Sequence, residues 1–446
     1  MSGTVLTSRP VSLLQPAVAP RLVYRLSIPG VALLSYGGLA GLWFWWSHPL
    51  YFGVLRLFGF RPFRFPFLDI EAVLAAVQCR RYGIDVYQWN PCDVLGRTHV
   101  YSPLWLRITP EFLDSDATTA VGLCLGLLFI VSLAEICRPT TRGEVAILGL
   151  AALSPVTVYA LERANCDLIV FMLVLGGGAL ARASRPWRLG AYALYLFSGM
   201  LKYYPLLLLV LIFRERQRDA IALTATAATV VLLLVLCDGA ELATALSNIP
   251  SLSHFADSFS ATNLPFGLAE ALCDGFGRLL IVVPLSGALL ALAATRTGRT
   301  IHLLDREALD WTGGEMQRLA IGAILITACF FSSQNVNYRG IYFLLALPGL
   351  VRLQRSAGGA SIRQFCQRMI AAVIFVMWEG SFRSAVHTIA GNSHGGGLNS
   401  RAEVFFWLGR ELVWWWLITG LASLSLCYLR QLPLARDALT RFRIRL

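Results

Sequence analysis

Long apolar runs recur from one end of the chain to the other, and they limit what it can fold into. Most have roughly 17–25 residues, the length that a helix needs to cross a bilayer core. Of the 446 residues, 56% are hydrophobic and 14% are charged, far less charge than a soluble protein carries. The sequence therefore predicts an all-α polytopic membrane protein with about 11–12 transmembrane helices. The predicted spans are 29–48, 118–137, 143–161, 166–181, 189–213, 219–237, 277–295, 317–333, 338–351, 369–390 and 404–428.

Arginines in the short loops predict the topology, because cytoplasmic loops of membrane proteins are enriched in Lys and Arg. With both termini cytoplasmic, the clusters at 138–142 and 182–188 lie inside. The cluster at 214–218 joins them only if 189–213 is a broken, re-entrant hairpin, and Pro205 disfavours helix at that point. The polar start of the chain and its first span then form an uncleaved signal anchor. The net charge of +12 belongs to the inner surface, so no nucleic-acid partner is expected.

The predicted outer loop 49–117 carries Asp69 shortly after the first span. A carboxylate at the membrane surface can act as a base on a lipid-borne substrate. Alternatively, Asp69 simply N-caps the amphipathic helix that follows it. Cys79 and Cys92 lie in the same loop and pair if that side is oxidising, with two free thiols as the alternative. A second outer loop is predicted at 238–274.

Further polar residues collect on the same predicted outer side of the membrane. Ionisable groups at membrane depth are expensive, and they usually face a cavity or a partner. Glu379, Arg383 and His387 are spaced four apart, so they share one helix face. Structural ion pairs, Glu379–Arg383 or Glu162–Arg163, and a satisfied interior histidine are the alternatives. The segments concerned are 162–167, Lys202, His254, 332–339, 379–387, Arg410 and Glu411.

One carboxylate surrounded by scattered basic residues suits sugar transfer from a lipid-phosphate donor. The carboxylate takes the proton of an acceptor hydroxyl, while Arg and Lys stabilise the departing phosphate. This arrangement fits an inverting displacement, because a retaining enzyme needs a second, close carboxylate. The reaction requires neither a metal nor a cofactor, and we expect none.

Two sequence blocks resemble the bacterial polyprenyl-phosphate-mannose-dependent α-mannosyltransferases, which form glycosyltransferase family 87 within the GT-C superfamily. The first is Glu162-Arg163-Ala164-Asn165-Cys166-Asp167, and the second is Gly199-Met200-Leu201-Lys202-Tyr203-Tyr204-Pro205. The first outer loop agrees with the family in Gly83-x-Asp85-Val86-Tyr87, Asn90-Pro91-Cys92-Asp93 and Tyr101-Ser102-Pro103-Leu104-Trp105. The resemblance covers about the first half of the chain. Ala164 and Cys166 depart from it, since the family pattern has Gly and an aliphatic residue there.

This resemblance implies one integral GT-C domain over 1–446, with a site on the outer face. Asp69 matches the family's catalytic acid in the first outer loop. The donor phosphate and lipid are expected at the basic residues and one tyrosine: Arg163, Lys202, Tyr203, Arg339, Arg383 and Arg410. Further substrate contacts are expected from Tyr101, Glu162, Asn165, Asp167, His254, Asn335 and Asn337.

The expected partners are a polyprenyl-phosphate sugar, which at family level means mannose, a lipid or glycan acceptor, and membrane lipid. The expected location is a bacterial plasma membrane, with the active site on the periplasmic side. A flippase of polyprenyl-linked glycans is the alternative, but it needs a polar pathway that reaches both faces. An O-antigen ligase typically has its very large outer loop late in the chain, whereas here the largest comes first.

Overall fold

The computed structural model describes residues 18–60, 63–273, 275, 277–307, 309–391, 398 and 400–443. The start of the predicted signal anchor, 1–17, lies outside this range. The described residues are mostly helical, and the only strands among them are β1 (Ser258–Phe259) and β2 (Asn335–Val336), which pair antiparallel. The predicted all-α class is confirmed.

Seven helices among the described residues are long and apolar enough to cross a membrane, or eight if the bent pair α6 (Arg142–Ala152) and α7 (Pro155–Glu162) forms one span. This confirms a polytopic membrane protein. Several other predicted spans coincide with shorter helices: α8 (Cys166–Leu180), α9 (Arg185–Leu201), η3 (Tyr204–Arg214) and α14 (Phe343–Ser356). The seven long spans contain α1 (Val18–Gly41) with η1 (Leu42–Trp46), η2 (Ser115–Ala117) with α5 (Thr118–Ile136), α10 (Gln217–Ser247), α12 (Gly277–Asp305), α13 (Gly314–Ser332), α15 (Ala360–Ile389) and α16 (Arg401–Arg430).

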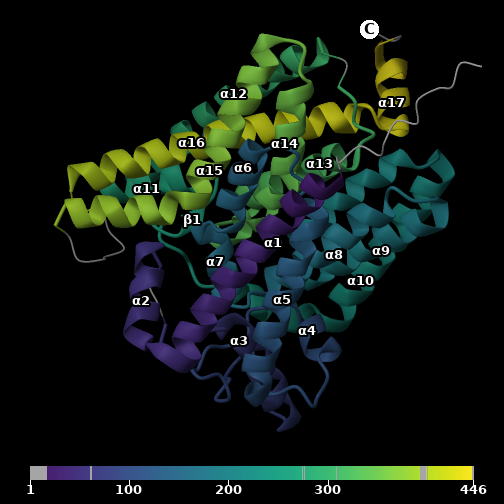
Figure 1. Ribbon diagram of the computed structural model, residues 1–446. Coiled ribbons are helices and arrows are strands. Elements are labelled where there is room, and N and C mark those ends of the chain that lie inside the picture. Colours follow the sequence, from purple (N-terminus) through teal and green to yellow (C-terminus); the bar gives the residue numbers. More distant parts are fainter. Residues whose placement is uncertain are drawn as a thin grey trace, which may run out of the picture.

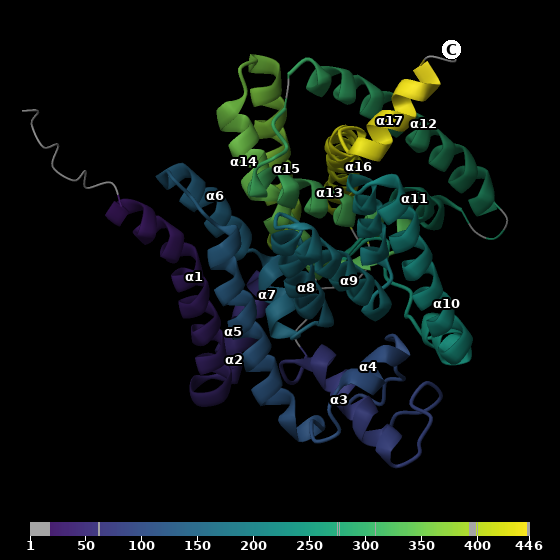
Figure 2. The same cartoon turned by 90° about the vertical axis from the view of Figure 1, so that its right-hand side faces the viewer.

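The core is built around α13, which packs against α14 and α16. Gly322 lets α13 and α14 approach closely, because a Cβ there would lie 2.9 Å from backbone atoms of Tyr342 and Ala346. By contrast, α10 and α12 expose most of their apolar side chains, and Figure 2 shows them at the edge of the molecule. Such apolar, exposed faces suit contact with lipid.

The loop between the first two long spans folds into a helical cap. It contains α2 (His48–Leu57), α3 (Leu68–Arg81) and α4 (Pro103–Ile108), and both views place α3 and α4 at the end of the molecule opposite α17 (Pro433–Arg443) (Figures 1 and 2). A disulfide between Cys79 and Cys92 ties α3 to the segment that follows it.

A helical hairpin forms where α9 ends and η3 runs back along it. The backbone turns extended at Lys202, and Pro205 lies in the first turn of η3, where a missing amide proton costs nothing. The Tyr192 hydroxyl donates to the Leu211 carbonyl at 3.2 Å, so the two limbs are antiparallel. Lys202 therefore sits at the tip of a turn, at the level of the cap.

Candidate active site

A cavity of about 700 Å³ is lined by residues of both the cap and α10. Its polar end includes the start of α3, the turn after α9 and residues 334–339, and its other arm is apolar. Of the predicted site residues, it is lined by Asp69, Tyr101, Arg163, Lys202, Tyr203 and Arg339.

Two backbone hydrogen bonds hold the start of α3, and with it Asp69, against the end of α7. The Phe67 amide donates to the Glu162 carbonyl at 2.7 Å, and the Asp69 amide donates to the Arg163 carbonyl at 3.0 Å. Phe67, with a left-handed φ of 65°, is the N-cap residue of α3. The alternative that Asp69 caps this helix is therefore wrong. Its carboxylate instead faces the turn between α7 and α8.

Both carboxylate oxygens of Asp69 have partners in that turn. Arg163 donates to one oxygen through Nη2 at 2.6 Å and Nε at 3.0 Å, and Asn165 donates to the other. Burial by itself would raise the pKa of Asp69, but the charge and hydrogen bonds of Arg163 outweigh it and lower the pKa. Asp69 is therefore a buried carboxylate that stays ionised at ordinary pH.

Arg163 was expected, as one alternative, to pair with its neighbour Glu162, but it pairs with Asp69. Arg163 Nη1 has no hydrogen-bond partner among the described residues, although it is buried. A buried guanidinium donor without a partner is costly. Since Arg163 also lines the cavity, this charged side chain lies in the cavity wall beside the carboxylate.

A second carboxylate, Asp167, gathers the remaining basic residues at the first turn of α8. Lys202 Nζ lies 2.9 Å from its Oδ2, and Arg339 Nε lies 3.6 Å from the same oxygen. Lys202 also donates to Asn165 at 3.2 Å, and Asn165 caps α8 by accepting from the Asp167 amide at 2.8 Å. One turn thus links the Asp69 carboxylate to Lys202.

The conformation of this turn favours glycine at position 164, where this chain has alanine. Ala164 has a φ of 42° and is fully buried. This left-handed conformation strains any residue with a Cβ, and glycine adopts it without strain. The glycine expected here from the sequence thus has a backbone reason, and the alanine of this chain adopts the same left-handed conformation.

Aromatic rings surround the basic residues. Lys202 Nζ lies 5.4 Å from the ring centre of Tyr101 and 6.0 Å from that of Tyr338. The Arg163 guanidinium lies 4.6 Å from the ring centre of Phe63. Tyr203 also lines the cavity, and its hydroxyl lies 2.9 Å from that of Ser333. Flat rings beside cations provide faces on which a sugar ring can stack.

The sequence did not predict a hydrogen-bond network centred on Arg97. Its Nη2 donates to the Leu68 carbonyl at 2.8 Å, to Asp93 at 2.7 Å and to Glu71 at 3.1 Å. These contacts hold the loop 90–97 on the first turn of α3 beside Asp69, and the disulfide holds it near the end of the same helix; together they form a clamp. The only signal in the sequence was the four-residue spacing of Asp93 and Arg97.

The apolar arm of the cavity is built mainly from α10. Its lining includes Leu206, Val231, Leu234, Val235, Leu242 and Leu246. Neighbouring side chains of α10, among them Leu232 and Leu236, are exposed on the outside of the bundle. An apolar chain lying in this arm would therefore reach the lipid-facing surface without leaving an apolar environment.

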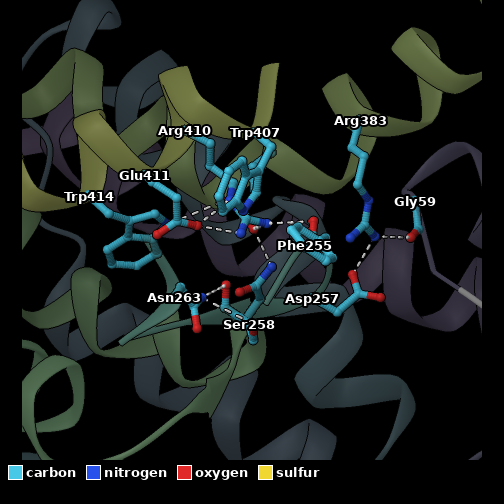
Figure 3. Close-up of polar contacts among 12 residues, drawn as sticks. Gly59, Phe255, Asp257, Ser258, Asn263, Arg383, Trp407, Arg410, Glu411 and Trp414 are labelled. Atoms are coloured by element: carbon cyan, nitrogen blue, oxygen red, sulfur yellow. Dashed lines mark hydrogen bonds and ion pairs between the residues drawn. The ribbon is translucent and has the colours of Figure 1, made fainter. Parts of the chain in front are cut away.

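A second polar cluster lies apart from the cavity, around Arg410 of α16 (Figure 3). Arg410 donates to Glu411 and to the carbonyls of His254 and Phe255. Glu379 lies 3.7 Å from Arg410. It accepts from Asn337 and from Trp414.

Arg383 belongs to the same region but has a different partner from the one considered in the sequence. It pairs with Asp257 and donates to the Gly59 carbonyl at 3.1 Å (Figure 3). The alternative pair Glu379–Arg383 is therefore not formed, because Glu379 contacts Arg410. His387 pairs with Glu403.

Eight predicted site residues do not line the cavity. Two of them, Asn165 and Asp167, instead contact the lining residues Asp69 and Lys202. His254 contacts Gln334 at 2.7 Å and stacks on Phe266, while Glu162 accepts from Tyr51 at 3.2 Å. Asn335 accepts from Arg339 and so orients that residue. The remaining three, Asn337, Arg383 and Arg410, belong to the second cluster.

No group of three or more His, Cys, Asp or Glu in the described part of the chain could hold a metal ion. The arrangement instead offers an ionised carboxylate, three cations and aromatic faces at one end of a half-apolar cavity. Such a site can bind an amphiphile whose head is anionic and accept a proton next to it.

Comparison with known proteins supports the resemblance seen in the sequence. Residues 99–314 match the family model of glycosyltransferase family 87. The matched stretch includes Arg163, Asp167 and Lys202 but ends before Arg339 and begins after Asp69. No curated protein and no solved structure matches the chain.

Proposed function

Since the family match and the apolar helices indicate a membrane glycosyltransferase, we propose that this chain transfers one sugar from a polyprenyl-phosphate carrier to a lipid or glycan acceptor. The sugar is mannose in this proposal, in keeping with the family resemblance. The observation that carries it is the cavity, which joins Asp69 and three basic residues to an apolar arm.

In the proposed reaction the acceptor hydroxyl oxygen attacks the anomeric carbon of the donor. The bond between that carbon and the phosphate oxygen breaks, and the carrier leaves as polyprenyl phosphate. The acceptor proton passes to Asp69. Because the pKa of Asp69 is lowered, the carboxylate is a weak base, and the proton moves once the new bond has made the attacking oxygen acidic.

Arg163, Lys202 and Arg339 would hold the phosphate and stabilise the charge that develops on it as the carrier leaves. The apolar arm along α10 would hold the first isoprene units of the carrier. Inversion is proposed because Asp167, which follows the same turn, is fully buried and paired with Lys202. It is therefore not placed as a nucleophile.

We further propose that the site faces the periplasm of a bacterial plasma membrane and that both termini are cytoplasmic. The distribution of arginines supports this topology. The Cys79–Cys92 disulfide in the cap also supports it, because such bonds persist in oxidising compartments.

The test is transfer from a panel of radiolabelled polyprenyl-phosphate sugars to membrane lipids, with wild-type protein and Asp69→Asn. Transfer by the wild type alone establishes the reaction and the base, and the donor panel identifies the sugar. Retained turnover in Asp69→Asn would contradict the mechanism in which Asp69 is the base. No transfer by the wild type with any donor would favour the flippase alternative.

A further inference from the structure

Six consecutive residues, Arg97 to Ser102, line the cavity from the cap side. Two contacts fix this strip beside the reacting groups: Arg97 donates to the Leu68 carbonyl at 2.8 Å, next to Asp69, and Lys202 lies over the Tyr101 ring. None of these contacts uses the side chains in the middle of the strip.

His99 occupies the middle of the strip and is only 2% exposed. Neither ring nitrogen has a hydrogen-bond partner of normal geometry among the described residues. Burial and the charge of Arg80 lower the pKa of His99 to about 3, although the nearby Ser102 backbone opposes this shift. The ring is therefore neutral, with one nitrogen that donates and one that accepts.

The neighbouring side chains offer the same chemistry. The Thr98 hydroxyl makes no hydrogen bond to another described residue, and the Tyr101 ring packs edge-on against His99 with 5.7 Å between ring centres. Arg97, the charged member of the strip, is already paired with Glu71 and Asp93. What remains is an uncharged set of donors and acceptors.

Such a set is complementary to hydroxyl groups, which also donate and accept. It contains no free cation that could bind a phosphate. We propose that Thr98 and His99 form a subsite for the sugar or polyol of the acceptor and direct its hydroxyl to Asp69. This inference rests on the proposed function. The donor phosphate is assigned to Arg163, Lys202 and Arg339, so the donor and the acceptor would approach Asp69 from different walls of the cavity.

The first test measures sugar binding without a reaction. The protein is placed in lipid nanodiscs, where no sugar-headed detergent competes, and binding of methyl α-mannopyranoside and of myo-inositol is followed by saturation-transfer NMR. Thr98→Val and His99→Leu are each expected to weaken binding of the preferred probe by about 3- to 10-fold, the worth of one hydrogen bond. His99→Gln, which retains a donor and an acceptor, is expected to lose less.

Matched controls are Thr388→Val and His302→Gln, which change the same residue types on helices away from the cavity. Thermal melting shows whether each variant is folded, and the nearly isosteric Thr98→Val keeps the test valid if His99→Leu does not fold. Unchanged binding in folded Thr98→Val and His99 variants, or no binding of either probe to the wild type, would overturn the inference.

The second test separates this subsite from the donor site. With an active wild type, the variants should raise the KM for the acceptor and leave the KM for the donor unchanged. A raised donor KM with an unchanged acceptor KM would assign the strip to the transferred sugar and overturn the inference. If the probes bind as expected but no donor is ever used, the proposed reaction fails while the sugar subsite stands.

Discussion

Two buried polar regions of this protein use the same residue types in opposite ways. Around Asp69 the side chains of Arg163 and Arg339 keep 12% and 15% of their surface exposed to the cavity. Around Arg410 the side chains of Arg410 and Glu411 are 1% and 0% exposed. One cluster opens onto a space that a substrate can enter, and the other is closed by protein.

The formal charges of the two regions also differ. The cavity cluster has three cations, Arg163, Lys202 and Arg339, for the two carboxylates Asp69 and Asp167. The closed cluster has one arginine for two carboxylates: Arg410 against Glu379 and Glu411. An anionic headgroup is therefore attracted to the first region and repelled by the second.

Replacing one carboxylate by its amide in each region should give the largest difference in transfer rate between two variants. Asp69→Asn removes the proposed base and should lower the transfer rate by about 10²- to 10⁴-fold, with a folded protein. Glu379→Gln should leave the rate per folded molecule within about twofold while lowering the melting temperature, because it removes a charge opposite Arg410. Transfer assays normalised to folded protein, with melting curves, measure both. Equal rate losses in the two variants would contradict the assignment of catalysis to the region around Asp69 alone.

Removing a cation from the closed region should act on stability. Arg410→Met leaves Glu379 and Glu411 buried without their arginine, which should cost about 3–5 kcal/mol of unfolding free energy. Chemical denaturation in detergent, compared with the exposed control Arg401→Met, measures the loss. A stable Arg410→Met protein with weakened donor binding would instead place this residue in the donor site.

Removing a cation from the cavity should act on the donor. Lys202→Met is expected to raise the donor KM by about 10- to 100-fold, the worth of a hydrogen bond to a charged group, with a smaller effect on the acceptor KM. Steady-state kinetics in which each substrate is varied separately distinguish the two. An unchanged donor KM would remove Lys202 from the proposed phosphate site.

The contrast also shows how far the sequence could predict the site. The fold class followed from the apolar runs, and the grouping of Arg163, Asn165 and Asp167 followed because they share one turn of the chain. Lys202 was expected, with the other outer polar residues, to face a cavity or a partner, and the structure places it in the cavity lining.

Hydropathy and topology gave each polar residue a depth in the membrane but no direction around its helix. Arg383 and Arg410 lie on long helices, and the contacts of α15 and α16 with their neighbours turn both residues toward β1 and away from the cavity. The Arg97 clamp depends on how an irregular loop folds over α3, which neither periodicity nor spacing specifies. Polar residues predicted at the same membrane depth were therefore assigned to one site, although Arg383 and Arg410 lie outside it.

The smallest expected effect concerns the clamp, which holds Asp69 from the cap side. Burial and the nearby Asp93 raise the pKa of Glu71 to about 7. Since the folded pKa lies above the unfolded value of 4.5, this group's contribution to stability is present below about pH 4.5 and is lost as the pH rises through about 7. Glu71→Gln removes that contribution, so the melting temperature of the wild type minus that of the variant should decrease over this range and then level off. The lowered pKa of Asp93 confines its own titration to more acidic solution. A difference that stays constant from pH 4.5 to 8 would mean that Glu71 titrates normally, and that the clamp holds α3 without a buried acid.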